Sequence, residues 1–233
     1  MLARRFVVAA ALTLVAGCAT APKSPYTFDK AALAGMVYDL DSRPVAGLVL
    51  TLVDMEPALV AQTDVLGRFL IPEVPRGKHR VRAVAAGFET ADSEISFLAR
   101  TQIMYIRIAS LEQLVNRAVG AAETGEWQRA EGYLGRAEAL APTELRVRYV
   151  RAAMETRAGR HDDARLLLEA LLADGFRRPA IYLLLADIHE RALGEPERAA
   201  EYLREYLKLR RDPAAEERLA RLSPEAVTPA EAP

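Results

Sequence analysis

The sequence is poor in the residues that most often carry out chemistry or cross-link a chain. Of its 233 residues, one is cysteine, one is tryptophan and three are histidine. A single cysteine excludes an intramolecular disulfide, so packing must stabilise the folded part. Lys and Arg together number 31 against 32 for Asp and Glu. This balance lacks the basic excess that nucleic-acid binding requires, and we expect no nucleic-acid partner.

Catalytic patterns are also missing. His79, His161 and His189 begin no H-x-x-E or H-E-x-x-H arrangement, so no zinc-peptidase pattern is present. There is no G-x-S-x-G motif, no phosphate-binding glycine loop and no free cysteine for nucleophilic work. Asp162 and Asp163 fit the first turn of a helix better than a metal site, and Asp39 and Asp41 fit a turn better than a calcium site. The sequence therefore predicts no enzyme, no metal and no cofactor.

Long apolar runs are scarce as well, and the one that stands out lies near the start. Arg4 and Arg5 precede an apolar run from Phe6 to Gly17. A basic start, a short apolar core and small residues before a cut describe a secretory signal. The run is too short for a comfortable membrane span. Val15-Ala16-Gly17-Cys18 resembles the lipobox of bacterial lipoproteins, whose cysteine is acylated and becomes the first mature residue. The alternative is an ordinary signal peptide with a stray cysteine.

The lipobox resemblance implies a location for the rest of the chain. Cleavage after residue 17 leaves 216 residues (233 − 17), held to a membrane by acyl chains on Cys18. Residues 18–30, with prolines among small and polar residues, are expected to be a tether. An aspartate after the cysteine usually retains such lipoproteins in the inner membrane, and this chain has Ala19 there. We therefore expect a bacterial envelope protein at the outer membrane, facing the periplasm.

Residues 31–109 have the pattern of a β-domain. Short runs rich in Val, Ile, Leu and Thr alternate with turn residues, and seven strands in under eighty residues favour an antiparallel sandwich. The expected strands are 33–40, 47–54, 59–63, 68–71, 79–85, 90–97 and 102–108.

The turns of this segment follow a known order. Gly35-x-Val37, Pro44-Val45-x-Gly47, Thr63-Asp64-x-x-Gly67-x-Phe69, Val74-Pro75-x-Gly77 and Ala86-Gly87-Phe88 resemble the carboxypeptidase regulatory-like domain. We expect Asp64 to cap its turn, Gly67 to adopt a positive φ and Phe69 to point inward. His79 is expected to be a packed imidazole. The resemblance implies a transthyretin- or Ig-like sandwich.

From residue 111 the pattern becomes helical and repetitive. Gly125, Gly159 and Gly194 each precede the spacing Ala-x-x-x-Leu, and they lie 34 and 35 residues apart (159 − 125 and 194 − 159). This period resembles the tetratricopeptide repeat, which implies an all-α solenoid of helix pairs. We expect three repeats over residues 110–213, and a capping helix with a disordered tail over 214–233. In repeat two, Arg148 and Arg151 stand where the first helix of this repeat family usually has apolar residues. The first helix of repeat two is therefore expected to be rotated or shifted by a residue.

The resemblance implies a concave groove lined by the first helices. Trp127 is expected to pack between the helices of its repeat instead. By family spacing the groove candidates are Asn116, Val119, Arg146, Tyr149, Ala153, Arg157, Ile181, Leu184 and Ile188. Their mixture of apolar and basic character suits an extended peptide or an acidic helix. The alternative is that the arginines are a solvated face and the apolar residues pack against the tail.

The sequence thus predicts an α+β two-domain protein: a β-sandwich followed by a helical solenoid. Its expected function is that of a lipid-anchored, non-catalytic adaptor that binds an envelope protein or peptide. Two other readings stay open, a glycan-binding or structural envelope protein that uses the sandwich, and an enzyme with an unrecognised site.

Overall fold

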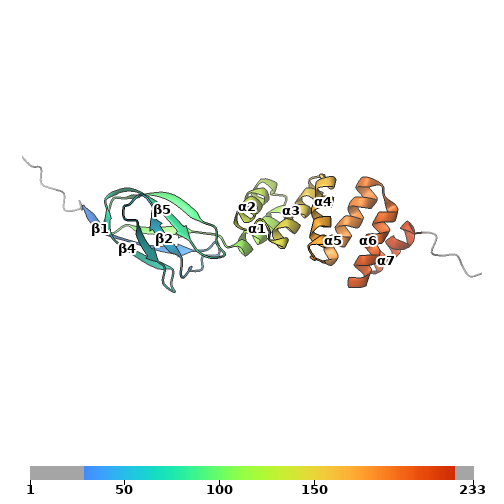
Figure 1. Ribbon diagram of the computed structural model, residues 1–233, viewed down its shortest axis with the longest axis horizontal. Helices are drawn as coiled ribbons and strands as arrows, with labels where there is room; N and C mark the ends of the chain where they lie inside the picture. Colours follow the sequence, from blue (N-terminus) through green and yellow to red (C-terminus); the bar gives the residue numbers. More distant parts are fainter. Residues whose placement is uncertain (1–28, 224–233) are drawn as a thin grey trace, which may run out of the picture.

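The computed structural model describes residues 29–223. The predicted signal segment, Cys18, most of the tether and the end of the tail lie outside these residues. The chain forms an elongated molecule in which seven strands precede a row of helices (Figure 1). The predicted fold class, a β-sandwich followed by a helical solenoid, is confirmed.

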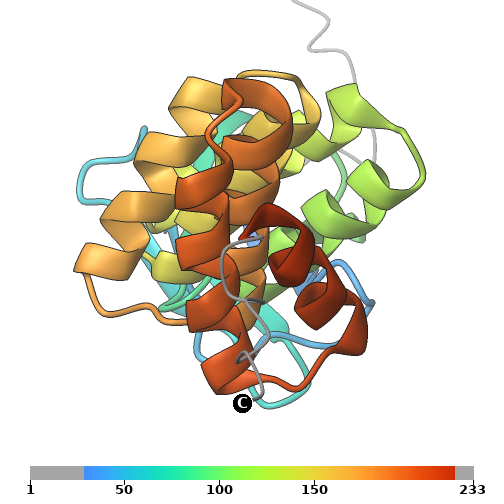
Figure 2. The ribbon, with the colours of Figure 1, turned by 90° about the vertical axis from the view of Figure 1, so that its right-hand side faces the viewer.

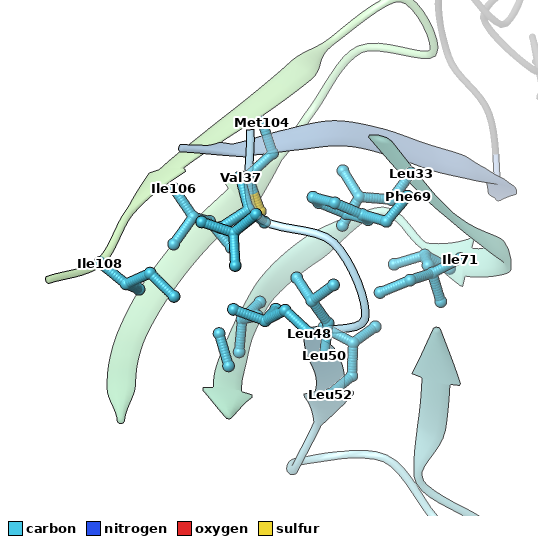
Figure 3. Close-up of a cluster of buried hydrophobic side chains, with 14 of the residues drawn as sticks. Leu33, Val37, Leu48, Leu50, Leu52, Phe69, Ile71, Met104, Ile106 and Ile108 are labelled. Carbon is cyan, nitrogen blue, oxygen red and sulfur yellow. The ribbon is translucent and has the colours of Figure 1, made fainter. Parts of the chain in front are cut away.

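The β-domain consists of two packed sheets. Sheet A has the strand order β4-β1-β7, and sheet B has the order β3-β2-β5-β6. The strands are β1 (Lys30–Tyr38), β2 (Val49–Leu52), β3 (Leu59–Gln62), β4 (Arg68–Pro75), β5 (Gly77–Val84), β6 (Ala91–Phe97) and β7 (Ile103–Arg107). Side chains from both sheets meet in one core (Figure 3), in which Leu33, Leu50 and Ile71 are fully buried.

Two details differ from the sequence prediction. The β1–β7 pair is parallel, with Ala34 beside Ile103, whereas the prediction was an antiparallel sandwich. Strand β4 also continues to Pro75, although the expected strand ended at residue 71 and Val74-Pro75-x-Gly77 was expected to be a turn. Pro72 is tolerated because it lies in an edge strand, at the point between Ala31 and Leu33 where the register of the β1–β4 ladder shifts.

The expected turn at Asp64 is confirmed. Asp64 Oδ1 accepts hydrogen bonds from the backbone N–H groups of Leu66 and Arg68, both at 2.9 Å. Gly67 has φ +72°, and Phe69 points inward with 5% of its surface exposed. These contacts fix the turn by which the chain passes from β3 of sheet B to β4 of sheet A.

The helical domain consists of antiparallel pairs. The pairs α1/α2, α3/α4 and α5/α6 each turn at a glycine of positive φ, namely Gly125, Gly159 and Gly194. Seen from its far end, the domain shows the pairs stacked behind one another (Figure 2). The helices are α1 (Leu111–Glu123), α2 (Trp127–Leu140), α3 (Leu145–Arg157), α4 (His161–Ala173), α5 (Pro179–Asp187), α6 (Pro196–Leu209) and α7 (Pro213–Leu222).

A short π-helix, η1 (Ile188–Leu193), interrupts the third pair between α5 and Gly194. Pro179 and Pro213 begin α5 and α7 at the first helical turn. Proline is favoured there because its missing N–H has no intrahelical partner in any case.

Helix α3 is regular, and its unusual arginines are explained by ion pairs. Arg148 pairs with Asp174 at the end of α4. Arg151 reaches Glu131 and Glu138 of α2, each at 2.8 Å. Helix α3 does not need to rotate to accommodate these arginines, because Val147 and Val150 still face the core.

Candidate functional site

The candidate site is a cleft between α1 and α3, the first helices of repeats one and two. It has a volume of about 250 Å³ and is lined by Val119, Ala122, Glu123, Tyr149, Val150, Ala153, Met154 and Arg157. Four of the predicted groove residues, Val119, Tyr149, Ala153 and Arg157, therefore lie together. We call this cleft the α1–α3 cleft.

The shape of the cleft follows from the sizes of its side chains. Val150 and Met154 form an apolar floor and expose 6% and 5% of their surfaces. Ala122 of α1 and Ala153 of α3 are too small to fill the space between the two helices. Helix periodicity places Tyr149 and Ala153 on one face of α3, with Arg157 one further turn along.

Tyr149 has one side in the core and one in the cleft. It packs against buried clusters on both sides of α3 and meets the Phe176 ring edge-on at 6.4 Å between centroids. Burial raises the pKa of its hydroxyl, because the ionised form loses hydration. Tyr149 therefore contributes both to stability and to the surface of the cleft.

Arg157 is the exposed cation at the cleft. Its side chain makes one hydrogen bond among the described residues, a long one of 3.3 Å from Nη1 to the carbonyl oxygen of Ala122. The guanidinium is thus available to a carboxylate on a ligand. Asn116 and Arg146 lie outside this cleft and bind each other, with Arg146 Nη2 donating to Asn116 Oδ1 at 2.6 Å.

A second cleft of about 370 Å³ shares Met154 and Arg157 with the first. Trp127, at the start of α2, lines it and exposes 45% of its surface. The expectation that Trp127 packs between the helices of its repeat is wrong. Its place as the first residue of α2, immediately after the Gly125 turn, was the available signal, since it lies at the end of the helix pair and not in its middle.

The candidates in repeat three are corrected by the structure. Ile181 is fully buried and Ile188 exposes 1% of its surface, so neither can meet a ligand. Leu184 packs partly against the same core. The prediction applied the 35-residue spacing of Gly159 and Gly194 to the whole repeat. The extra residue of repeat three is taken up by the π-helical turn of η1. Residues of α5 therefore lie 34, and not 35, residues after their counterparts in repeat two. Each candidate was accordingly placed one residue too late.

Helix α7 takes up the outer side of repeat three. Arg218 pairs with Asp187 and Glu190, and Leu219 and Leu222 of α7 pack in a cluster that includes Leu183. The cap therefore leaves the α1–α3 cleft open while it occupies the end of the solenoid.

No group of three or more His, Cys, Asp or Glu side chains within residues 29–223 is arranged to hold a metal ion. His79 is packed, as expected: its ring nitrogens lie 3.0 Å from Asp54 Oδ2 and 2.8 Å from the carbonyl oxygen of Pro75. Asp39 accepts hydrogen bonds from the N–H groups of Asp41 and Arg43, as expected for a turn. None of the helices described has the length and apolar character that a membrane span needs.

Comparison with known proteins agrees with the division into two modules. Residues 32–108 match the model of the carboxypeptidase regulatory-like domain. No curated protein matches the chain.

The similar solved structures cover about half of the chain. PilF of Pseudomonas aeruginosa is 21% identical with a TM-score of 0.45, over 50% of this chain and 54% of that one. YrrB, described as a tetratricopeptide protein with an unusual peptide-binding site, is 18% identical with a TM-score of 0.43, over 49% and 59%. The Yersinia enterocolitica type III secretion chaperone SycD, in complex with a YopD peptide, is 17% identical with a TM-score of 0.44, over 50% and 95%. The chain thus spans little more than half the length of PilF and YrrB.

The second module consists of helix pairs that each turn at a glycine, and these glycines recur at 34 and 35 residues. This geometry is that of the tetratricopeptide repeat. The chain therefore carries a carboxypeptidase regulatory-like domain followed by a solenoid of tetratricopeptide type.

Proposed function

We propose that this chain is a lipid-anchored, periplasm-facing adaptor of the cell envelope that binds an extended segment of a partner protein and carries out no catalysis. The observation that carries the proposal is the α1–α3 cleft. Its floor of Val150 and Met154 is apolar, and Arg157 at its rim lacks a carboxylate partner among the described residues.

The chemistry of the cleft defines the partner. An apolar side chain of a peptide would be desolvated on the floor, and a neighbouring acidic side chain would meet the guanidinium of Arg157. Tyrosine and arginine are also the residue types that most often dominate binding energy at interfaces. An extended segment or a helix with apolar and acidic residues therefore fits this surface.

The anchor is the second half of the proposal. Acylation of Cys18 would confine the protein to a thin layer at the membrane and raise the effective concentration of the cleft toward envelope partners. Replacement of Cys18 by serine should abolish lipid labelling and release the protein from membranes. If neither the unchanged chain nor the Cys18→Ser variant is labelled with lipid, and both stay on membranes, the proposal of a lipoprotein is contradicted.

Site-specific photo-crosslinking tests the cleft. A photoreactive amino acid at position 153, on the wall of the cleft, should give one specific crosslinked partner segment in membranes. The control position is 166 on α4, where Leu166 is 56% exposed and lies outside the cleft. Equal crosslinking of the same partner from both positions would show that the cleft is not the binding site.

A further inference from the structure

The outward surface of sheet A is apolar. Three neighbouring strands place their outward side chains in rows across the sheet: Leu70 beside Ala34 and Ile103, and Arg68 beside Met36 and Tyr105. Leu70, Ile103 and Tyr105 expose 58%, 54% and 65% of their surfaces. We call Ala34, Met36, Leu70, Ile103 and Tyr105 the sheet A face.

Sheet B shows what a solvated face looks like in the same domain. Its outward surface carries cross-strand ion pairs between β5 and β6, Lys78 with Glu94 at 2.9 Å and Arg82 with Asp92 at 2.8 Å. The strands of sheet A carry no such cross-strand pair among the described residues. Sheet A thus presents exposed apolar side chains without the ion pairs of sheet B, and contiguous exposed apolar side chains of this kind mark interaction surfaces.

The charges around the sheet A face are mostly of one sign. Of the four charged side chains on its strands, Lys30, Arg68 and Arg107 are basic, and only Glu73 is acidic. Arg107 has no ion-pair partner among the described residues, whereas Arg68 pairs with Asp64. The face thus combines exposed apolar and tyrosine side chains with basic ones at its edges, which is the composition of a surface that lies at a lipid–water interface.

The start of the described chain lies at this same sheet. Strand β1 is the central strand of sheet A, and it begins at the end of the sandwich far from the helices (Figure 1). Lys30 is 12 residues after Cys18 (30 − 18), which limits its distance from the anchor to about 40 Å even when extended. An acylated Cys18 would therefore keep the sheet A face within reach of the bilayer.

We propose that the sheet A face docks on an anionic lipid surface, as a second and weaker contact beside the anchor. This inference rests on the proposed anchoring, but the face binds lipid through its own side chains. Leu70, Ile103 and Tyr105 enter the headgroup region, while Lys30 and Arg107 meet lipid phosphates. Docking by this face lays the strands along the membrane, so that the helical domain extends beside the bilayer rather than away from it.

Vesicle binding tests the face without the anchor. The chain from residue 19 to 233 retains every contact described above, because these lie within residues 29–223. We expect it to sediment with phosphatidylcholine vesicles that contain phosphatidylglycerol, more than with phosphatidylcholine alone. Ile103→Ser with Tyr105→Ser should weaken binding about tenfold or more, because two exposed apolar contacts are lost.

The matched control lies on the other sheet. Val60 and Val84 of sheet B expose 57% and 45% of their surfaces, and Val60→Ser with Val84→Ser should leave vesicle binding unchanged. A label at Ile103→Cys should be quenched by nitroxide lipids and one at Val60→Cys should not, since residues 19–233 contain no other cysteine.

Three outcomes would overturn the proposal: no vesicle binding, equal loss in both double variants, or a dimer in solution that Ile103→Ser with Tyr105→Ser abolishes while vesicle binding persists unchanged. Lipid labelling of Cys18 in the full chain is measured separately. Failure of the anchor therefore stays distinguishable from failure of the face.

Discussion

At the scale of single residues, glycines decide where the sandwich can turn. Gly47 and Gly67 have almost the same backbone, with φ +71° and +72°. Their surroundings differ. A Cβ on Gly67 would lie 2.5 Å from the carbonyl oxygen of Val37, whereas the nearest atom to a Cβ on Gly47 is a flexible Gln62 nitrogen at 3.8 Å.

This pair separates backbone strain from collision. Gly47→Ala should lower the free energy of unfolding by about 1 kcal/mol, the cost of a left-handed conformation for a residue with a Cβ. Gly67→Ala should cost about 2–3 kcal/mol, because the strand pair must also shift. Chemical denaturation of the two variants checks this, and equal losses would show that the Val37 contact does not constrain the turn.

At the scale of elements, ion pairs hold α3 against its neighbours. Arg151 exposes 21% of its side chain and binds Glu138 through two nitrogens, both at 2.8 Å. Glu131 and Glu155 complete a network around the same guanidinium. The surrounding carboxylates raise the pKa of Arg151 above its ordinary value, and the hydrogen bonds to Glu138 are the main cause.

Removal of Arg151 should leave Glu131 and Glu138 without their cation, whereas Glu155 keeps its pair with Arg160. Arg151→Met is expected to reduce the free energy of unfolding of the helical domain by about 1–3 kcal/mol. Arg129, whose pair with Glu126 lies on the surface, provides the control, and Arg129→Met should change stability little. Equal stability of the two variants in thermal unfolding would contradict the role given to Arg151.

The elements also show how far sequence reasoning reaches. All seven strands and the glycine turns of the three helix pairs were predictable, because alternation and the 34-residue period are local patterns. The parallel β1–β7 pair was not, since strands over sixty residues apart leave no mark of their mutual direction. The burial of Ile181 and Ile188 was missed for a similar reason. Nothing in the sequence shows that the extra residue of repeat three belongs to η1.

At the scale of the whole molecule, the two modules are joined without a linker. Ile108 and Ala109 are fully buried, and Ser110 caps α1. Loops of the sandwich bind the first helices: Asp41 accepts from Gln113 Nε2 and Arg117 Nη2, both at 2.8 Å, and Glu89 pairs with Arg136 of α2. This junction keeps the cleft in a fixed orientation relative to the sandwich.

The junction should loosen in acid. Hydrogen bonds from Gln113 and then Arg117 lower the pKa of Asp41 below its ordinary 3.8. A lowered pKa in the joined state means that Asp41 stabilises the junction above the ordinary value, and that this contribution is lost as pH falls through the lowered one. X-ray scattering should therefore show a longer, more flexible molecule as pH falls below about 4.

Two variants isolate this effect. Asp41→Asn should loosen the junction at neutral pH and remove its share of the acid transition. Glu94→Gln, which breaks the exposed ion pair with Lys78 on sheet B, should leave the scattering unchanged at neutral pH. A change in overall shape with pH that is identical in all three proteins would assign the transition to other groups.

The central claim is that the α1–α3 cleft binds a partner, and the affinity of the segment crosslinked from position 153 tests it most directly. Ala153→Arg with Arg157→Glu fills the cleft and reverses the charge at its rim. Leu166→Arg with Arg177→Glu makes the same charge changes on exposed residues outside the cleft. We predict that the cleft variant binds the segment at least about tenfold more weakly, at an unchanged melting temperature, while the control binds normally. Undiminished binding by the cleft variant would contradict the account.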